Sequence, residues 1–162
     1  MWYTSCPLDH LETTSGGGKA LRPEDMLCFE LHAASRAMTA VYRPLLKDLG
    51  LTYPQYLVMV LLWEREPRLV NELGRALELD SGTLSPLLKR LEASGLILRQ
   101  RREEDERELE VTLTDAGHRL KARARDIPGA IERATNLAPG EMDELVGKLA
   151  SLRASLHREL PE

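Results

Sequence analysis

Cys28 is the residue of this sequence best placed to do chemistry, because the pattern puts it near the start of a helix. Pro23 suits a first helical turn, and the acidic Glu24 and Asp25 complement the positive end of a helix dipole. The same dipole stabilises a thiolate, which is the reactive form of cysteine. The sequence therefore predicts a reactive thiol, and a small buried hydrophobic side chain is the alternative interpretation.

A zinc site is a second alternative. Cys6 and His10 are four residues apart, and so are Cys28 and His32, a spacing that places two ligands on one face of a helix. Cys6 lies beside Pro7 in a segment without helical periodicity, so the two pairs are weak evidence for a Cys2His2 site. We therefore expect no metal ion and no other cofactor, and we expect His32 either to act on Cys28 electrostatically or simply to be exposed.

A second group of residues points to nucleic acid. Between Ser81 and Arg102, five basic residues stand against one acidic residue, a local net charge of +4 in a chain whose total is −4. Such a patch attracts phosphate groups, although a solvated surface is the ordinary interpretation of a charge run. One side of a predicted helix in this segment carries Ser81, Thr83, Ser85 and Lys89. Small polar side chains of this kind allow a helix to enter a DNA groove.

Arg107 follows the turn of a predicted hairpin. An arginine at such a tip can enter the minor groove of DNA, and Asp105 is placed to orient it. A surface salt bridge without function is the alternative interpretation of this pair.

The composition fits one domain preceded by a flexible arm. Of 162 residues, 43% are hydrophobic, enough for a core, and 4% are aromatic, which favours packed helices over a β-sandwich. Residues 1–22 contain a Thr-Ser-Gly stretch and are expected to form the arm, and residues 23–162 the domain. The longest apolar run, Leu57 to Trp63, is far too short to span a membrane, and no secretory signal is visible. We expect a cytoplasmic protein that does not bind membranes.

Hydrophobic periodicity predicts six helices and one β-hairpin. The helices are expected from Pro23 to about Leu49, from Thr52 through a buried Leu57–Trp63, from Leu69 to Leu79, from Ser81 to Gly95, from Thr114 with a kink at Pro128, and from Pro139 to Leu160. The hairpin strands are expected at Ile97–Arg101 and Arg107–Leu113. The predicted core faces are Leu69, Leu73, Ala76 and Leu77 in the third helix and Leu84, Leu87, Leu88 and Leu91 in the fourth.

This order predicts a mainly α winged helix-turn-helix with a small β-hairpin wing and a DNA-binding core at about residues 52–113. The terminal helices, at about 23–49 and 114–160, carry apolar stripes that a core of this size does not need. A homodimer joined through the N- and C-terminal helices explains them, and packing of each stripe on its own domain is the alternative.

Three linked motifs resemble those of the MarR transcriptional regulators. They are Leu79-Asp80-Ser81-Gly82-Thr83-Leu84-Ser85-Pro86-Leu87-Leu88-Lys89-Arg90-Leu91-Glu92 followed by Gly95-Leu96-Ile97, then Glu104-Asp105-Glu106-Arg107, then Leu113-Thr114-Asp115-Ala116-Gly117. The cysteine segment, Leu27-Cys28-Phe29-Glu30-Leu31, is similar to that of the organic hydroperoxide sensor (OhrR) branch. The resemblance implies a homodimeric winged-helix repressor on a pseudo-palindromic DNA operator. We predict DNA contacts from Ser81, Thr83, Ser85, Pro86, Lys89, Arg90, Arg99, Asp105 and Arg107.

The resemblance also implies that the hydroxyl groups of Tyr42 and Tyr53 hold the sulfur of Cys28. Cys28 and Tyr42 are about 21 Å apart along a continuous helix, so Tyr42 would reach Cys28 of the other subunit if the two first helices run antiparallel. No cysteine follows Cys28. The one-cysteine scheme of the branch therefore fits best: a sulfenic acid forms and is then capped by a low-molecular-weight thiol or overoxidised. Resolution by Cys6 is the alternative.

We therefore expect a redox-sensing repressor and not an enzyme, with organic hydroperoxides as inducers that oxidise Cys28 and release the dimer from DNA. Two alternatives stay open. One is a MarR-type repressor that responds to a small phenolic ligand. The other is a thiol peroxidase, which would need a recycling system and leaves the basic patch unexplained.

Overall fold

The computed structural model describes residues 22–102 and 108–159 of the chain. The chain divides into two compact units, Met1–Arg36 and Ala37–Glu162, and each is described by itself. Almost all of the predicted arm lies outside the described residues, as does the tip of the predicted wing. Among the described residues, no helix is both long and apolar enough to cross a membrane.

The first unit holds a short 3-10 helix, Pro23–Asp25, and the beginning of α1 (Leu27–Lys47). The sequence analysis placed one helix from Pro23 onward, and this was wrong in detail. Met26 has an extended backbone (φ −100°, ψ 124°) that separates the 3-10 turn from α1. α1 itself is one helix of 21 residues, and the side chains of Leu27 and Phe29 near its start are exposed.

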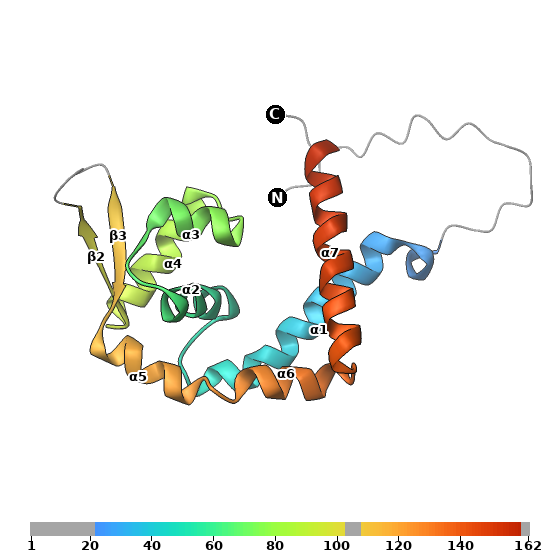
Figure 1. Ribbon diagram of the computed structural model, residues 1–162, viewed down its shortest axis with the longest axis horizontal. Coiled ribbons are helices and arrows are strands. Elements are labelled where there is room, and N and C mark those ends of the chain that lie inside the picture. Colours follow the sequence, from blue (N-terminus) through green and yellow to red (C-terminus); the bar gives the residue numbers. More distant parts are fainter. Residues whose placement is uncertain (1–21, 103–107, 160–162) are drawn as a thin grey trace, which may run out of the picture. The chain divides into compact units, whose positions relative to one another are not determined.

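Three helices form the core of the second unit: α2 (Tyr53–Glu64), α3 (Val70–Leu77) and α4 (Ser81–Ala93) (Figure 1). Thr52 precedes α2 as predicted, and its backbone N–H donates to Oε1 of Gln55 at 2.8 Å. Asp80 precedes α4, and its carboxylate accepts from the backbone N–H of Thr83 at 2.8 Å. These bonds satisfy donors that a helix start leaves without partners, and so fix where each helix begins.

Leu73 of α3 and four leucines of α4 pack in this core together with buried side chains of α2. The predicted core face of α4 is confirmed, because Leu84, Leu87, Leu88 and Leu91 are all buried. Two predictions were wrong. Val60 is 39% exposed although α2 was expected to be buried all round, and Ala76 lies on the exposed side of α3. The inward face of α3 is centred on Leu73, which is fully buried.

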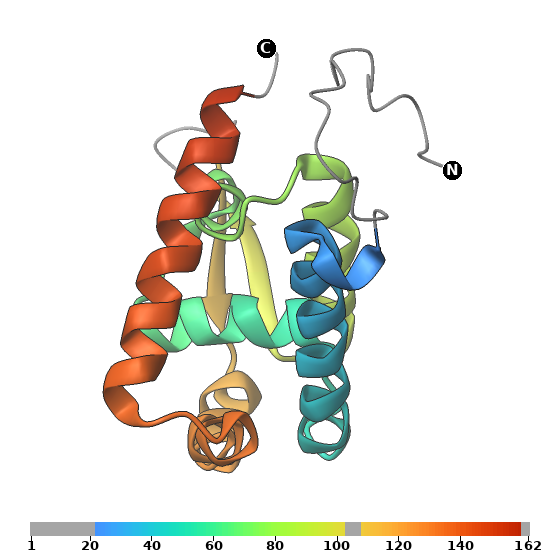
Figure 2. The ribbon, with the colours of Figure 1, turned by 90° about the vertical axis from the view of Figure 1, so that its right-hand side faces the viewer.

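The sheet has three antiparallel strands in the order β1-β3-β2, and the sequence analysis predicted only two of them. β2 (Ile97–Arg101) and β3 (Leu109–Leu113) form the hairpin and lie side by side in Figure 2, with Arg99 opposite Val111. β1 (Arg68–Leu69) pairs with the other edge of β3. Leu69 was predicted to be helical, but it pairs with Glu110 and α3 begins one residue later.

The last three helices are α5 (Asp115–Arg123), α6 (Ile127–Thr135) and α7 (Pro139–Glu159). Thr114 caps α5 as predicted, but the expected kink at Pro128 is a complete break, because three non-helical residues separate α5 from α6. α7 exposes large apolar side chains along its length, namely Leu145, Val146, Leu149 and Leu156. Arg153 of α7 forms an ion pair with Glu78 after α3 at 3.2 Å.

Candidate DNA interface and redox site

α4 carries six of the nine side chains that the sequence predicted to contact DNA. Ser81, Thr83, Pro86, Lys89 and Arg90 are all exposed, and Ser85 is half-buried. The opposite side of the helix is anchored by the buried leucines of the core. α4 therefore presents a small, hydroxyl-rich first half followed by two cationic side chains to solvent, a surface that fits a DNA major groove.

The N-terminus of α4 is held by Asp80. Its carboxylate accepts from the backbone N–H of Thr83 at 2.8 Å and from the Thr83 hydroxyl at 3.1 Å. The hydrogen bond from the Thr83 backbone, followed by the one from its hydroxyl, lowers the pKa of Asp80. A charged carboxylate at a helix start also interacts favourably with the helix dipole. Asp80 is therefore ionised at neutral pH, and it turns the Thr83 hydroxyl toward the helix start.

The wing contributes a further group of basic residues. Arg101 and Arg102 of this group are exposed, and Arg102 forms an ion pair with Glu108 at 2.9 Å across the base of the hairpin. The predicted minor-groove pair, Asp105 and Arg107, lies outside the described residues.

Arg99 differs from the other predicted DNA contacts. Its side chain is only 18% exposed, and its Nε donates to Oε2 of Glu92 at 3.0 Å. Glu92 lies at the end of α4 and Arg99 lies in β2, so the pair joins the helix to the wing. The sequence analysis overlooked Glu92 because it counted this residue only as the one acidic charge in a basic stretch.

Cys28 lies in the first turn of α1, where its thiol is free and exposed. The position of Cys28 at the start of a helix agrees with the prediction. The alternative interpretation, a small buried hydrophobic side chain, does not hold within the described chain, because Cys28 is exposed there. His32, one turn later, is exposed. Among the residues that the structure describes, no three His, Cys, Asp or Glu side chains gather as metal ligands would, and Cys6 and His10 lie outside them.

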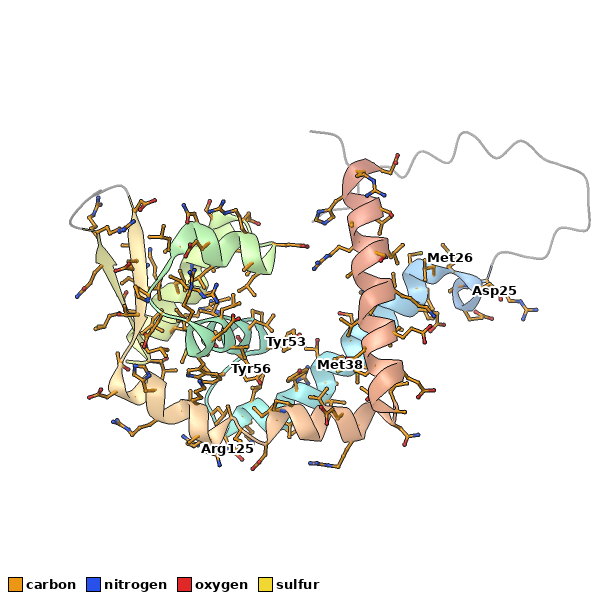
Figure 3. The ribbon with its side chains drawn as sticks, viewed as in Figure 1. Asp25, Met26, Met38, Tyr53, Tyr56 and Arg125 are labelled. Atoms are coloured by element: carbon orange, nitrogen blue, oxygen red, sulfur yellow. The ribbon has the colours of Figure 1, made fainter. Side chains whose placement is uncertain are left out.

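Tyr42 and Tyr53 lie together in the second unit. Their ring centroids are 4.6 Å apart, with the planes tilted by 46°, although the residues come from different helices. A third tyrosine, Tyr56, lies one turn further along α2 with its ring 5.9 Å from that of Tyr42. Figure 3 shows Tyr53 and Tyr56 on the side of α2 that faces α1. The sequence analysis missed Tyr56, although its spacing of three residues from Tyr53 indicates a shared helix face.

Burial keeps the phenols of Tyr42 and Tyr56 protonated. Desolvation, followed by the neighbouring rings of Tyr53 and Tyr56, raises the pKa of Tyr42 above its ordinary value of 10.0. Desolvation also raises the pKa of Tyr56. A neutral phenol is a hydrogen-bond donor, so the Tyr42 hydroxyl can donate to an anion at any physiological pH.

Comparison with known proteins assigns the family. A family model described as "Transcriptional regulator SarA/Rot" matches residues 40–124. An organic hydroperoxide resistance transcriptional regulator of Bacillus subtilis is 48% identical over 86% of this chain and 95% of its own length. The chain belongs to the MarR family. Within that family it belongs to the organic hydroperoxide sensor branch, as the motifs around Cys28 and α4 predicted.

Other members of the MarR family agree with this assignment. The regulator TtmR of Methylorubrum extorquens is 47% identical over 83% of this chain and 69% of its own length. Structures of AbfR of Staphylococcus epidermidis bound to DNA, one reduced and one overoxidised, each match with a TM-score of 0.70 and 38% identity over 82% of this chain and 93% of AbfR. The mainly helical winged-helix fold of MarR regulators is thereby confirmed, and these relatives are transcriptional regulators.

Within the MarR fold, α3 and α4 are the helix-turn-helix and β2 and β3 are the wing. Glu78, the residue that ends α3, has a left-handed backbone with φ 53°. This turn and the buried leucines of α4 determine which side of the MarR recognition helix is free, and that side carries the predicted DNA contacts.

Proposed function

We propose that this MarR-family protein is a transcriptional repressor that senses organic hydroperoxides through Cys28. A homodimer binds a pseudo-palindromic DNA operator through the two α4 helices and the two wings. Oxidation of Cys28 releases the dimer from DNA. Because its partner is genomic DNA, we expect the protein to act in the cytoplasm.

The observation that carries this proposal is the contact between Tyr42 and Tyr53. Two hydroxyl groups can hold one sulfur atom only if their rings are neighbours, and these rings are 4.6 Å apart. Cys28 and Tyr42 are fourteen residues apart in one continuous helix, so the thiolate they hold would be Cys28 of the partner subunit. Each sensing site is then shared between two protomers, and a dimer is required for sensing.

The exposed apolar residues of the terminal helices support such a dimer. Leu27 is 61% exposed and Phe29 44% near Cys28, and Leu149 of α7 is 42% exposed. Large apolar side chains that are clustered and exposed on two helices are typical of an interface between protein chains. Closed two-fold symmetry is the commonest way for identical chains to bury them.

The redox step is a two-electron oxidation of sulfur. The Cys28 thiolate attacks the terminal oxygen of ROOH, the O–O bond breaks, and the departing alkoxide takes a proton to become the alcohol ROH. The product on the protein is a sulfenic acid. A low-molecular-weight thiol then displaces hydroxide from this sulfur as water, which leaves a mixed disulfide, or a second peroxide overoxidises it.

Loss of the thiolate is sufficient to account for release. A neutral, larger sulfur group no longer accepts two charge-assisted hydrogen bonds from tyrosine hydroxyls, and bonds of this kind stabilise by about 1.5–3 kcal/mol each. A hundredfold decrease in operator affinity needs about 2.8 kcal/mol. The half-sites of an operator lie about one turn of the DNA helix apart. A small change in the spacing of the two α4 helices therefore weakens binding to both half-sites.

The proposal is tested with a duplex that the unmodified protein selects from a random-sequence pool of double-stranded DNA. We expect fluorescence anisotropy to show tight binding by the reduced protein and release after one equivalent of cumene hydroperoxide. Cys28→Ser should bind the same duplex and fail to release it, whereas Cys6→Ser should respond as the unmodified protein does. Release of Cys28→Ser by peroxide would contradict the proposal, and many turnovers of peroxide per subunit would indicate a peroxidase.

A further inference from the structure

We infer that Arg99 and Glu92 are positioning residues, and that their ion pair holds the wing at a fixed place beside the recognition helix without either residue touching DNA. The inference rests on the proposed DNA binding. It assigns Arg99 a role different from the direct DNA contact that the sequence predicted.

The geometry of the pair favours this role. The Arg99 guanidinium donates from both Nε and an Nη to the same oxygen, Oε2 of Glu92. A planar guanidinium held at two points has little rotational freedom. Glu92 is in the last turn of α4 and Arg99 is in the middle of β2, so this fork restrains the direction in which β2 leaves the helix.

Burial separates Arg99 from its basic neighbours. The side chain of Arg99 is 18% exposed, whereas Lys89, Arg90 and Arg101 are all exposed. A phosphate contact needs a cation that reaches solvent. The guanidinium of Arg99 is instead turned inward to the carboxylate, and the hydrogen bond from this side chain lowers the pKa of Glu92. The Glu92 carboxylate is therefore ionised at neutral pH.

The strand pairing and the turn before β2 show what the ion pair adds to the wing. β2 is an edge strand that pairs only with β3 on one side, and β3 pairs with β1 through just two residues. Between α4 and β2 lies a turn with Gly95 at φ +70°. Backbone hydrogen bonds from Gly95 to Glu92 and from Leu96 to Leu91 close this turn, and the Arg99–Glu92 pair adds a side-chain link from α4 to a point further along β2.

The two possible roles of Arg99 predict opposite effects of one substitution. Glu92→Gln removes a negative charge near DNA and frees Arg99. If Arg99 contacts phosphate, Glu92→Gln should strengthen binding to the selected duplex. If the pair positions the wing, Glu92→Gln should weaken binding by about three- to tenfold, the size of coupling expected between residues in direct contact.

The experiment compares Glu92→Gln, Arg99→Gln and the double variant with the unmodified protein by fluorescence anisotropy over a range of salt concentrations. We expect each single variant to weaken binding to a similar degree, the double variant to be no weaker than either, and the salt dependence to stay unchanged. Loss of a phosphate contact would instead reduce the slope of log K against log salt by about one unit in Arg99→Gln. That result, or tighter binding by Glu92→Gln, would overturn the inference.

Glu64→Gln is the matched control, since it makes the same change in charge and removes the ion pair between the exposed carboxylate of Glu64 and Arg68. Arg68 keeps its hydrogen bond to the Leu61 carbonyl, so little else should change. Hydroxyl-radical footprinting measures an effect that general destabilisation of the protein would not produce. In Glu92→Gln, protection of the minor groove by the wing should be lost while protection by the recognition helix remains. An unchanged footprint would overturn the inference, and failure of the unmodified protein to select a duplex would contradict the proposed function instead.

Discussion

The indole N–H of Trp63 donates a hydrogen bond of 3.0 Å to the backbone carbonyl of Gly117. It joins the end of α2 to the first turn of α5, which is 54 residues away in the sequence. Lys121 reinforces the junction by donating to the Trp63 carbonyl at 2.8 Å. α5 is therefore fixed to the end of α2, and its first turn packs against the chain before β2.

Gly117→Ala should destabilise this junction. A Cβ at Gly117 would overlap the backbone oxygen of Leu96, which cannot move aside as a side chain does. We expect the free energy of unfolding to fall by about 3 kcal/mol, measured by urea denaturation. Gly140→Ala is the control, because a Cβ there meets nothing within 4 Å, and it should change stability by no more than about 1 kcal/mol. Equal effects of the two substitutions would contradict the packing described here.

Tyr42→Phe and Tyr53→Phe should each slow the reaction of Cys28 with hydroperoxide. Each variant keeps the ring contact and removes one hydroxyl donor to the thiolate. We expect about a tenfold lower rate of sulfenic acid formation for each, measured by stopped-flow with cumene hydroperoxide. Tyr56→Phe, whose ring lies 6.2 Å from that of Trp63, is the matched control and should react at the parental rate. Parental rates in all three variants would exclude a role for the tyrosines.

Lys89→Ala should weaken binding to the selected duplex through loss of a phosphate contact. The side chain is exposed on the free side of α4. Removal of one such contact should reduce the slope of log K against log salt by about one unit, with a similar loss of affinity for unrelated sequences. Lys47→Ala, at the exposed end of α1, removes the same charge and serves as control. The prediction fails if both variants show the same salt dependence.

Leu149→Asp should give a folded monomer. Leu149 is 42% exposed in the single chain, so a charge there costs the protomer little, but in a dimer interface it would be buried without a partner. We expect sedimentation velocity at micromolar concentration to show monomers and anisotropy to show loss of tight DNA binding. Ser151→Asp, on another side of α7, should remain dimeric. A monomeric parent protein would contradict the shared sensing site.

Stability should decrease in acid partly through Asp80. Its pKa is lower in the folded protein than the ordinary 3.8, so the stability it contributes is present above that value and is lost as the pH falls through the folded pKa. Asp80→Asn keeps a capping oxygen without the charge. The parent should unfold at a higher urea concentration than Asp80→Asn at neutral pH, and the difference should shrink below about pH 4. A difference that grows in acid would contradict the assignment.

Local signals in the sequence predicted most helix starts and the core of α4. Thr52 and Thr114 each precede the helix that they were expected to start, and α4 begins at Ser81 as predicted, because capping depends on a few adjacent residues. β1 could not be predicted, since two residues carry no periodicity and Arg68 and Leu69 are extended only because β3 offers them an edge.

The contacts of the candidate site also divide into those that the sequence predicted and those that it did not. Exposure along α4 follows from helical periodicity and was predicted. The partner of Arg99 was not, because Glu92 and Arg99 lie in different elements and meet only when the turn between them brings β2 back across α4. The contact of Tyr42 with Tyr53 likewise depends on how α1 and α2 pack, and only the family resemblance indicated it.

The base of the wing is closed by Arg102 and Glu108. The backbone N–H of Arg102 donates to the Glu108 carbonyl at 3.0 Å, beside their ion pair. These contacts close the strand pair at Arg102 and Glu108, on the strand side of the segment that holds the predicted DNA contacts Asp105 and Arg107. If Asp105 and Arg107 contact DNA as proposed, substitutions between Arg102 and Glu108 can alter DNA preference and leave the hydrogen bonds that close the strand pair in place.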